Sequence, residues 1–300
     1  MQTLRIPASS GNVGVGFDST GLSISLYNEI DFAVAKNGKL TIEQATGENI
    51  PCNAHNLVYK AAQQTASYLQ KELPPLFLRQ YNHIPLASGL GSSAACIVGG
   101  IMIADALLGG NLSKADMLKI ATKMEGHPDN AAPVIYGGVC ISQMEQNGIF
   151  TYPLAIKESL SLALIIPNTS LATKKARSVL PGEIPVKDAV HNIACMGLLV
   201  SALLQEEYAL LEKALDDRLH QPYRKELIPN FDTIIAHAKE LGAYGACLSG
   251  AGPTMLAFID TQKKEAFAAD LEKTLAQYET QYRVLPASID LLGAHFMTRD

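Results

Sequence analysis

The stretch "PLASGLGSSAA", Pro85 to Ala95, decides the fold of this chain. Glycine and serine fill its centre, and the residues that follow are apolar through about Leu108, as in a buried helix. Gly89 and Gly91 let backbone N–H groups turn toward a ligand without obstruction by a Cβ atom. The expected helix N-terminus adds unpaired N–H groups and the positive end of a dipole. Together these features bind phosphate without a lysine, so the stretch predicts a phosphate loop.

We expect Ser92 or Ser93 to cap this helix, and their hydroxyls can also serve a phosphate oxygen or a magnesium ion. Asp105 is the only charge before Leu108, which predicts a helix buried on most sides. A glycine-rich turn capped by serine is an equally good interpretation of the bare loop. The neighbouring proline and the buried helix favour the ligand site.

Composition limits the class of protein. The 300 residues hold 24 lysines and arginines against 29 aspartates and glutamates, a net charge of −5 without a basic run. This balance disfavours general binding to nucleic acid or to an anionic membrane. Five scattered cysteines without a C-x-x-C pair indicate free thiols in a reducing compartment. We see no signal-peptide core and no stretch approaching 18 uncharged apolar residues with membrane flanks, so we expect a cytoplasmic protein.

Hydrophobic periodicity predicts an α+β fold. Strands are expected over 3–7, 22–26, 30–35, 39–43, 76–79 and 160–167, and helices over 56–66, 113–124 and most of 188–241. The end of the chain is predicted as strand, strand, helix and strand over 243–248, 254–259, 261–278 and 282–288. Glycine-rich, strand-rich sequence gives way to helices at 150–160, which predicts an N-terminal domain over 1–155 and a C-terminal domain over 156–300.

The segment "EGHPDN", Glu125 to Asn130, gathers carboxylates, an imidazole and an amide around Gly126 and Pro128. Glu125 closes the helix predicted over 113–124, where a negative charge opposes the dipole by about 0.3–1 kcal/mol. A surface glutamate tolerates that position. The alternative is that Glu125 coordinates magnesium, which takes one or two protein oxygens beside phosphates.

Two further glycine-rich segments lie near the ends of the chain. "IPASSGNVGVGFDSTGLSI", Ile6 to Ile24, fails the dinucleotide-binding fingerprint because Ser19 stands at its third glycine position. Alone, the segment predicts a strand, a turn and a second strand. Its glycines leave few side chains near Asn12 and Asp18. "GACLSGAGPTMLAF", Gly245 to Phe258, reads either as a plain hairpin or as a loop close to the ligand.

Taken together, these four segments resemble the GHMP kinases, a family named for galacto-, homoserine, mevalonate and phosphomevalonate kinases. Pro85–Ala95 is similar to the family's phosphate loop, and Gly245–Phe258 to its C-terminal glycine motif. The segment Ile6–Ile24 and the central "EGHPDNAAPVIYGG" resemble the homoserine kinases within the family. The resemblance covers about residues 4 to 290. It implies an N-terminal domain like the second domain of ribosomal protein S5, followed by a ferredoxin-like domain, and homodimers are common in the family.

The resemblance implies a site for ATP, Mg²⁺ and L-homoserine. The phosphate-loop positions are Pro85, Ala87, Ser88, Gly89, Leu90, Gly91, Ser92, Ser93, Ala94 and Ala95, and the adenine positions are Asn56, Leu57 and Val58. Ser93 and Glu125 are the implied magnesium ligands. The substrate positions are Asn12, Asp18, His127, Thr173, Arg177, Arg224 and Gly250. Within this set, Asp18 suits the ammonium group, and Arg177 and Arg224 suit the carboxylate.

The sequence does not decide how Asn130 and Asp129 act on the substrate hydroxyl. Phosphoryl transfer requires in-line positioning and charge neutralisation more than a strong base. The resemblance favours Asn130 as the group that orients the substrate hydroxyl. Asp129 is then structural, or it is the catalytic base.

Some positions depart from the expected pattern. Gly11, Val13 and Val15 stand where Ala, Leu and Pro are expected, and the segment between Glu125 and His127 is shorter than in some homoserine kinases. Two alternative functions remain open. One is a kinase for another small alcohol, and the other is a ligand sensor that binds ATP without turnover.

Overall fold

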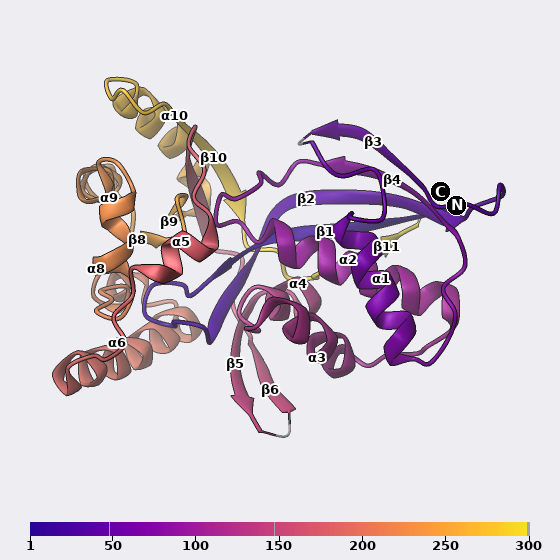
Figure 1. Ribbon diagram of the computed structural model, residues 1–300. Helices are drawn as coiled ribbons and strands as arrows, with labels where there is room; N and C mark the ends of the chain where they lie inside the picture. The colour runs from indigo at the N-terminus through magenta and orange to yellow at the C-terminus, as the bar shows by residue number, and fades with distance from the viewer. Residues whose placement is uncertain (48, 147, 299–300) are drawn as a thin grey trace.

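The computed structural model describes residues 1–47, 49–146 and 148–298, and its described strands form two sheets (Figure 1). The larger sheet contains β1 (Gln2–Gly11), β2 (Thr20–Val34), β3 (Thr41–Gly47), β4 (Leu76–Asn82), β5 (Val139–Glu145), β6 (Gly148–Leu154) and β11 (His295–Met297). Its order is β11-β1-β2-β4-β3, and β2 also pairs with the β5–β6 hairpin. The long strand β2 therefore carries neighbours at both of its ends.

The smaller sheet has the order β10-β7-β9-β8. It contains β7 (Leu160–Pro167), β8 (Gly245–Leu248), β9 (Met255–Asp260) and β10 (Tyr282–Ser288). Helix α9 (Phe231–Glu240), the 3-10 turn Thr261–Lys263 and helix α10 (Lys264–Leu275) accompany these strands. The predicted ending of two strands, a helix and a strand is confirmed. A β-bridge between Ile24 and Ile289 joins the two sheets.

Four helices of the N-terminal half pack with the larger sheet: α1 (Leu57–Tyr68), α2 (Ser92–Leu108), α3 (Lys114–Glu125) and α4 (Ala131–Tyr136). Asn56 caps α1, and Ser113 forms a capping box with Asp116 at α3. The prediction that Ser92 or Ser93 caps α2 is wrong. Gly91 is the N-cap, in a left-handed conformation with φ 65°, so α2 begins without a side-chain cap.

The C-terminal half contributes α5 (Thr173–Ser178), α6 (Val186–Gln205), α7 (Leu211–Ala214) and α8 (Gln221–Arg224), with 3-10 turns at Tyr208–Leu210 and Lys225–Leu227. Helices therefore dominate 188–241 as predicted, but they come in short pieces. Among the described helices, α6 alone is long and apolar enough to cross a membrane by length and composition. The sequence pattern did not predict such a segment.

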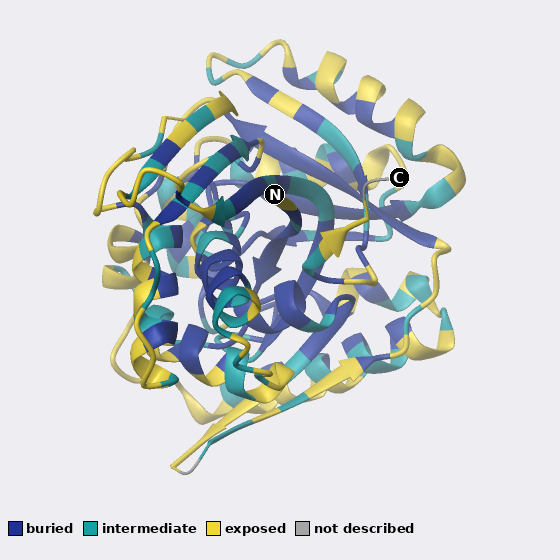
Figure 2. Cartoon of the chain, turned by 90° about the vertical axis from the view of Figure 1, so that its right-hand side faces the viewer, coloured by how far each residue is buried: buried dark blue, intermediate teal, exposed yellow. Residues whose placement is uncertain are grey.

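One hydrophobic core runs through both halves of the molecule. Leu4, Leu22 and Ile101 of the first half share it with Leu162 and Phe258 of the second. A smaller cluster fills the space between the second sheet and helices α9 and α10. Figure 2 shows dark blue strands at the centre and yellow outer faces on the surrounding helices. The burial expected for α2 is confirmed, because most of its residues from Ala94 to Ala104 are buried.

Three described strands, β5, β6 and β11, were not predicted, and the strands predicted over 22–26 and 30–35 form one continuous β2. The sequence pattern breaks because β2 has half-exposed residues between buried ones, and β6 has exposed and half-exposed residues up to its buried last residue. β11 returns to the first sheet and pairs with β1. The boundary at 155 falls between β6 and β7 and stays a prediction, and residues 299–300 of the predicted second domain lie outside the described residues.

Candidate active site

A cavity of about 360 Å³ lies where loops from both halves of the chain meet. It is lined by Asn12, Asp18, Pro85, Ala87, Ser88, Gly89, Leu90, Gly91, Ser92, Ser93, Met124, Glu125, His127, Asp129, Asn130, Thr173, Arg177, Arg224, Gly250 and Ala251. The fold thus brings together every predicted substrate and catalytic position and eight of the ten predicted phosphate-loop positions.

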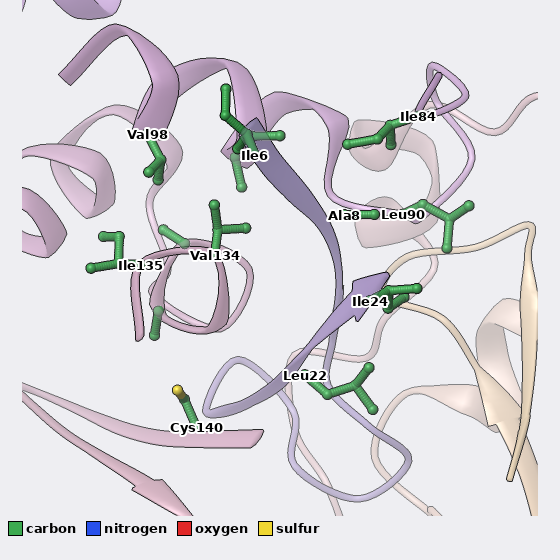
Figure 3. Packing of buried hydrophobic residues seen from close by; sticks show 14 of the residues in the cluster. Ile6, Ala8, Leu22, Ile24, Ile84, Leu90, Val98, Val134, Ile135 and Cys140 are labelled. Atoms are coloured by element: carbon green, nitrogen blue, oxygen red, sulfur yellow. The ribbon is translucent and has the colours of Figure 1, made fainter. Parts of the chain in front are cut away.

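The predicted phosphate loop, Pro85–Ala95, contains three residues in left-handed conformations. Ala87, Gly89 and Gly91 have φ values of 48°, 87° and 65°. Leu90 anchors the loop in the core beside Ile84 (Figure 3), and its carbonyl accepts a hydrogen bond of 3.1 Å from the Ser9 N–H. The buried leucine holds the loop in place. The α2 N-terminus, whose first N–H groups have no partner within the helix, lies at the cavity.

The β8–β9 loop closes on the phosphate loop. The Ser249 hydroxyl lies 2.8 Å from the Gly89 carbonyl oxygen, and the Gly250 N–H donates to the Gly11 carbonyl at 3.1 Å. A Cβ atom on Gly89 would overlap with the backbone of Ser249. Glycine is therefore required at position 89 for space as well as for its φ of 87°. The two glycine-rich ends of the chain and the central loop form one surface.

Glu125 carries the most unusual electrostatics of the site. Its Oε2 atom is buried without a hydrogen-bond partner among the described residues. Burial raises the pKa of Glu125 to about 7, against the lowering effects of His127 and the Ser93 hydroxyl. An orphaned carboxylate oxygen beside a hydroxyl and a phosphate loop is the donor set that a hard divalent cation prefers. The residues present therefore fit Mg²⁺ bound by Glu125 and Ser93.

His127, Asp129 and Asn130 form a connected group between α3 and α4. The His127 ring pairs with the Asp129 carboxylate, which also accepts the Asn130 N–H at 3.0 Å. This carboxylate, followed by the charges of Asp18 and Glu125, raises the pKa of His127 against the effect of burial. Ser9 donates to the Asn130 Oδ1 atom at 3.1 Å, which directs the amide N–H groups away from Ser9. Asp18, His127 and Asp129 also offer ligand atoms within 4.8 Å of one another.

Asn12 and Asp18 occupy the loop between β1 and β2, both with left-handed φ values of 67° and 53°. The Asn12 amide donates to the Gly250 carbonyl at 2.8 Å and accepts the Asp18 N–H at 3.0 Å. Asp18 then accepts two hydrogen bonds from Arg177, of 3.0 and 2.7 Å. Asn12 therefore fixes the backbone that presents the Asp18 carboxylate.

Arg224 is the only predicted cation of the site that is fully buried, with 2% of its surface exposed. It donates to the carbonyls of Ala176 and Gly250, each at 3.2 Å. Burial, followed by the nearby charge of Arg177, lowers its pKa. No described carboxylate forms an ion pair with it within 4.0 Å, so its charge is available to an anionic ligand.

Sequence reasoning missed the groups that support Arg224. Buried His220 lies 3.3 Å from an Arg224 nitrogen through Nδ1, and its Nε2 lies 2.6 Å from the Gly14 carbonyl. Because Nε2 must donate to that carbonyl, Nδ1 is the acceptor. Phe17 stacks on His220 and lies under both arginines of the site. A buried histidine three residues after Asp217 gives no local signal of this role. Met124, Ala251 and Ser9 were also missed.

Five predicted nucleotide positions do not line the cavity. Ala94 and Ala95 are buried in the core, because they lie on the inner side of α2. Asn56, Leu57 and Val58 lie at the start of α1, where the Asn56 side chain accepts the N–H groups of Val58 and Tyr59. The Asn56 oxygen is thus committed to capping. The contact of these residues with adenine stays a prediction.

The chain matches two family models: the GHMP kinases N-terminal domain over residues 56–138 and the GHMP kinases C-terminal domain over residues 199–277. It is 40% identical over 306 residues to a homoserine kinase of Clostridium botulinum, with full coverage of both chains. It is 41% identical over 279 residues to a homoserine kinase of Caldicellulosiruptor saccharolyticus, covering 93% of this chain and 90% of the other. A crystal structure of homoserine kinase from Cytophaga hutchinsonii superposes with a TM-score of 0.89 at 27% identity, over 99% of this chain and 97% of that one.

Proposed function

Since this chain belongs to the GHMP kinase family and, within it, to the homoserine kinases, we propose that it transfers the γ-phosphoryl group of ATP to the side-chain hydroxyl of L-homoserine. The product is O-phospho-L-homoserine, and the reaction is a step of threonine biosynthesis. A soluble enzyme of the cytoplasm fits this role. The observation that supports homoserine as the substrate is the set of two arginines and one aspartate beside the phosphate loop.

The charges of the cavity match an amino-acid zwitterion. Asp18 supplies the anion for the ammonium group, while Arg177 and Arg224 supply planar donor pairs for the carboxylate. Asn12 and Gly250 hold these groups in register through their mutual hydrogen bond. Thr173 lies one helical turn before Arg177 on α5 and adds a hydroxyl to the same wall of the cavity. Without an α-carboxylate, a substrate would leave the buried Arg224 charge uncompensated.

We assign the orientation of the substrate hydroxyl to Asn130. Ser9 occupies the Asn130 oxygen, and the Asn130 amide nitrogen donates to Asp129 at 3.4 Å, so its second N–H can donate to a hydroxyl oxygen in the cavity. Asp129 already binds His127 and the Asn130 N–H, which suits a carboxylate that positions its neighbours. The proton of the hydroxyl then leaves on the phosphoryl group of the product, so no strong base is required.

The phosphate loop accounts for ATP binding without a lysine. Its left-handed backbone and the N-terminus of α2 surround the phosphates, and the loop is held by Leu90 and Ser249. Ser93 and Glu125 would hold Mg²⁺, which supplies charge neutralisation to the transferring phosphoryl group when it is bound. The predicted N-terminal domain, residues 1–155, carries the phosphate loop, Ser93 and Glu125, and residues 156–300 supply Ser249 and both arginines.

The decisive experiment measures ADP release by the purified protein with ATP and Mg²⁺ on addition of L-homoserine. We expect turnover with homoserine and a kcat/KM at least about 10³-fold lower for mevalonate and galactose, since neither can pair with Asp18 and both arginines. ATP binding without ADP release would identify a ligand sensor instead. Preferred turnover of a substrate without an ammonium group would overturn the assignment of homoserine.

A further inference from the structure

His220 is fully buried and does not line the cavity, yet both of its ring nitrogens have a partner. Its Nε2 lies 2.6 Å from the Gly14 carbonyl oxygen, and its Nδ1 lies 3.3 Å from Nη1 of Arg224. A carbonyl oxygen only accepts hydrogen bonds, and a guanidinium only donates them. Both contacts therefore require the same neutral tautomer, with the proton on Nε2 and the lone pair of Nδ1 facing Arg224.

The backbone around His220 is fixed by a buried carboxylate. Asp217 accepts the backbone N–H groups of His220 and Gln221 at 2.8 and 2.7 Å. Asn192 donates to the same carboxylate at 2.7 Å. Helix α8 follows, and the Arg224 N–H donates to the His220 carbonyl at 3.1 Å. Side chains four residues apart on a helical turn are neighbours, so the imidazole and the guanidinium are held side by side.

The contacts of Arg224 leave one end of its guanidinium free. Nε donates to the Ala176 carbonyl and Nη1 to the Gly250 carbonyl, each at 3.2 Å, and the second Nη1 N–H faces His220. These three contacts use three of the five N–H groups and fix the plane of the guanidinium. Nη2 donates to none of the described residues. It is therefore the end that remains for an anionic ligand.

A neutral acceptor holds Arg224 without cancelling its charge. The carboxylates whose charges reach this arginine belong to Asp18, Asp129 and Asp217, and among the described residues none lies within the ion-pair distance of 4.0 Å. Burial lowers the pKa of His220, against the raising effect of Asp217, which favours the neutral ring. A carboxylate in place of His220 would instead pair with the arginine and compete with an anionic ligand.

Phe17 supports the imidazole from the other side. The two rings stack with centroids 5.4 Å apart and 28° between their planes, and Cζ of Arg224 lies 5.3 Å from the Phe17 centroid. Phe17 directly precedes Asp18, and Gly14 lies in the same loop between β1 and β2. The loop that presents Asp18 and the turn that presents Arg224 are thus joined through His220.

We propose that His220 is a positioning residue of the substrate site, whose neutral Nδ1 atom turns the Nη2 end of Arg224 toward the carboxylate of L-homoserine. This inference rests on the proposed function and deepens it, because it assigns part of the carboxylate recognition to a residue that does not touch the substrate. Loss of the contact should weaken homoserine binding and leave ATP binding unchanged. The effect should also depend on Arg224.

Two substitutions of similar size separate the two nitrogens of His220. Asparagine places an amide oxygen near the position of Nδ1, whereas glutamine places an amide nitrogen near the position of Nε2 and keeps only the contact with Gly14. We expect His220→Gln to raise the KM for homoserine at least about tenfold and His220→Asn less than about threefold, since a hydrogen bond to a charged group is lost only in the first. The KM for ATP should stay the same in both. His237→Gln is the control, because His237 lies on α9 and does not line the cavity.

His220→Asp provides a second comparison, which does not depend on the folding of His220→Gln. It has the shape of His220→Asn but carries a charge that would pair with Arg224. We expect its KM for homoserine to exceed that of His220→Asn at least about tenfold. Circular dichroism and thermal unfolding check that each variant is folded. Equal KM values for the aspartate and asparagine variants would show that a neutral acceptor is not required, and would overturn the proposal.

A double-mutant cycle tests whether His220 acts through Arg224. In an Arg224→Lys background, His220→Gln should change the KM for homoserine by less than about twofold, because residues that act through each other are not additive. An equal increase in both backgrounds, or a higher KM in His220→Asn than in His220→Gln, would indicate a merely structural role and overturn the inference. Absence of homoserine turnover by the natural chain would overturn the proposed function and this inference with it. Turnover with an unchanged KM in His220→Gln would overturn this inference alone.

Discussion

Arg177 and Asp18 bind each other through two parallel hydrogen bonds of 3.0 and 2.7 Å, although 159 residues separate them in the sequence. Both line the cavity, and both are partly exposed, so their ion pair contributes at most about 1 kcal/mol. In the proposed function, the ammonium and carboxylate groups of the amino acid would each replace one member of the pair. The small energy of the pair predicts that it opens at little cost when the amino acid binds.

Replacing either arginine with lysine tests the recognition of the carboxylate. Arg177→Lys and Arg224→Lys remove the planar donor pair while keeping the charge. We expect each to raise the KM for homoserine about 10- to 100-fold, since a hydrogen bond between charged groups is worth roughly 1.5–3 kcal/mol. The KM for ATP should change little. Arg218→Lys is the control, because Arg218 pairs with Asp188 and does not line the cavity. An unchanged KM for homoserine in both variants would show that neither arginine binds the substrate carboxylate.

Replacing Asp129 with asparagine separates a positioning role from a base. Asp129→Asn keeps the shape of the side chain and should lower kcat by less than about 10³-fold, since general bases contribute up to 10²–10⁴-fold. Asn130→Leu, which removes the proposed hydroxyl contact, should cost more. The measurement is single-turnover phosphoryl transfer with folding checked by circular dichroism. A larger loss in Asp129→Asn than in Asn130→Leu would identify Asp129 as the base.

The stability of the magnesium-free protein should fall as pH rises. The folded pKa of Glu125 is raised to about 7 from 4.5, so its protonation stabilises the fold fully below about pH 4.5. That contribution is lost as pH rises through about 7, and it amounts to roughly 3–4 kcal/mol at 1.36 kcal/mol per pKa unit. The raised pKa of His127 likewise lowers the stability of the protein as pH rises above 6.5.

Urea unfolding at about pH 5 and about pH 8 measures this dependence. Glu125→Gln should remove the contribution of Glu125 to the pH dependence of the unfolding free energy. Mg²⁺ should stabilise the natural protein at the higher pH but leave the stability of Glu125→Gln nearly unchanged. Equal stabilisation of both proteins by Mg²⁺ would show that the ion binds elsewhere.

Two glycines at opposite ends of α2 provide a matched pair for the phosphate loop. Gly91 and Gly109 have φ values of 65° and 58°, so alanine strains both backbones to a similar degree, by about 1 kcal/mol. Only at Gly91 would the new Cβ overlap with Ser9, whereas Gly109 faces open space. We therefore expect Gly91→Ala to raise the KM for ATP at least about tenfold and Gly109→Ala to leave it unchanged. Similar kinetics in the two variants would argue against the phosphate-loop assignment.

Local elements could be predicted because their causes lie within a few residues. The capping box at Ser113 involves only Asp116, and the Asn56 cap reaches only Val58 and Tyr59. The β5–β6 hairpin could not be predicted, because its outward residues, such as Phe150 and Tyr152, are apolar and exposed and give no alternation. The four site segments were identified through their joint resemblance to one family. None of them was decisive alone.

By itself, the sequence determined where a phosphate loop built from backbone rather than lysine is expected, because glycine freedom and a helix N-terminus are local properties of residues 85–95. The tertiary structure alone decided which charges face each other. It set Arg177 on Asp18, and among the described residues it left the Arg224 charge without a carboxylate and the buried Glu125 oxygen without a partner. These outcomes depend on how two sheets pack through one core. No spacing in the sequence encodes a contact between residues 159 or 238 positions apart.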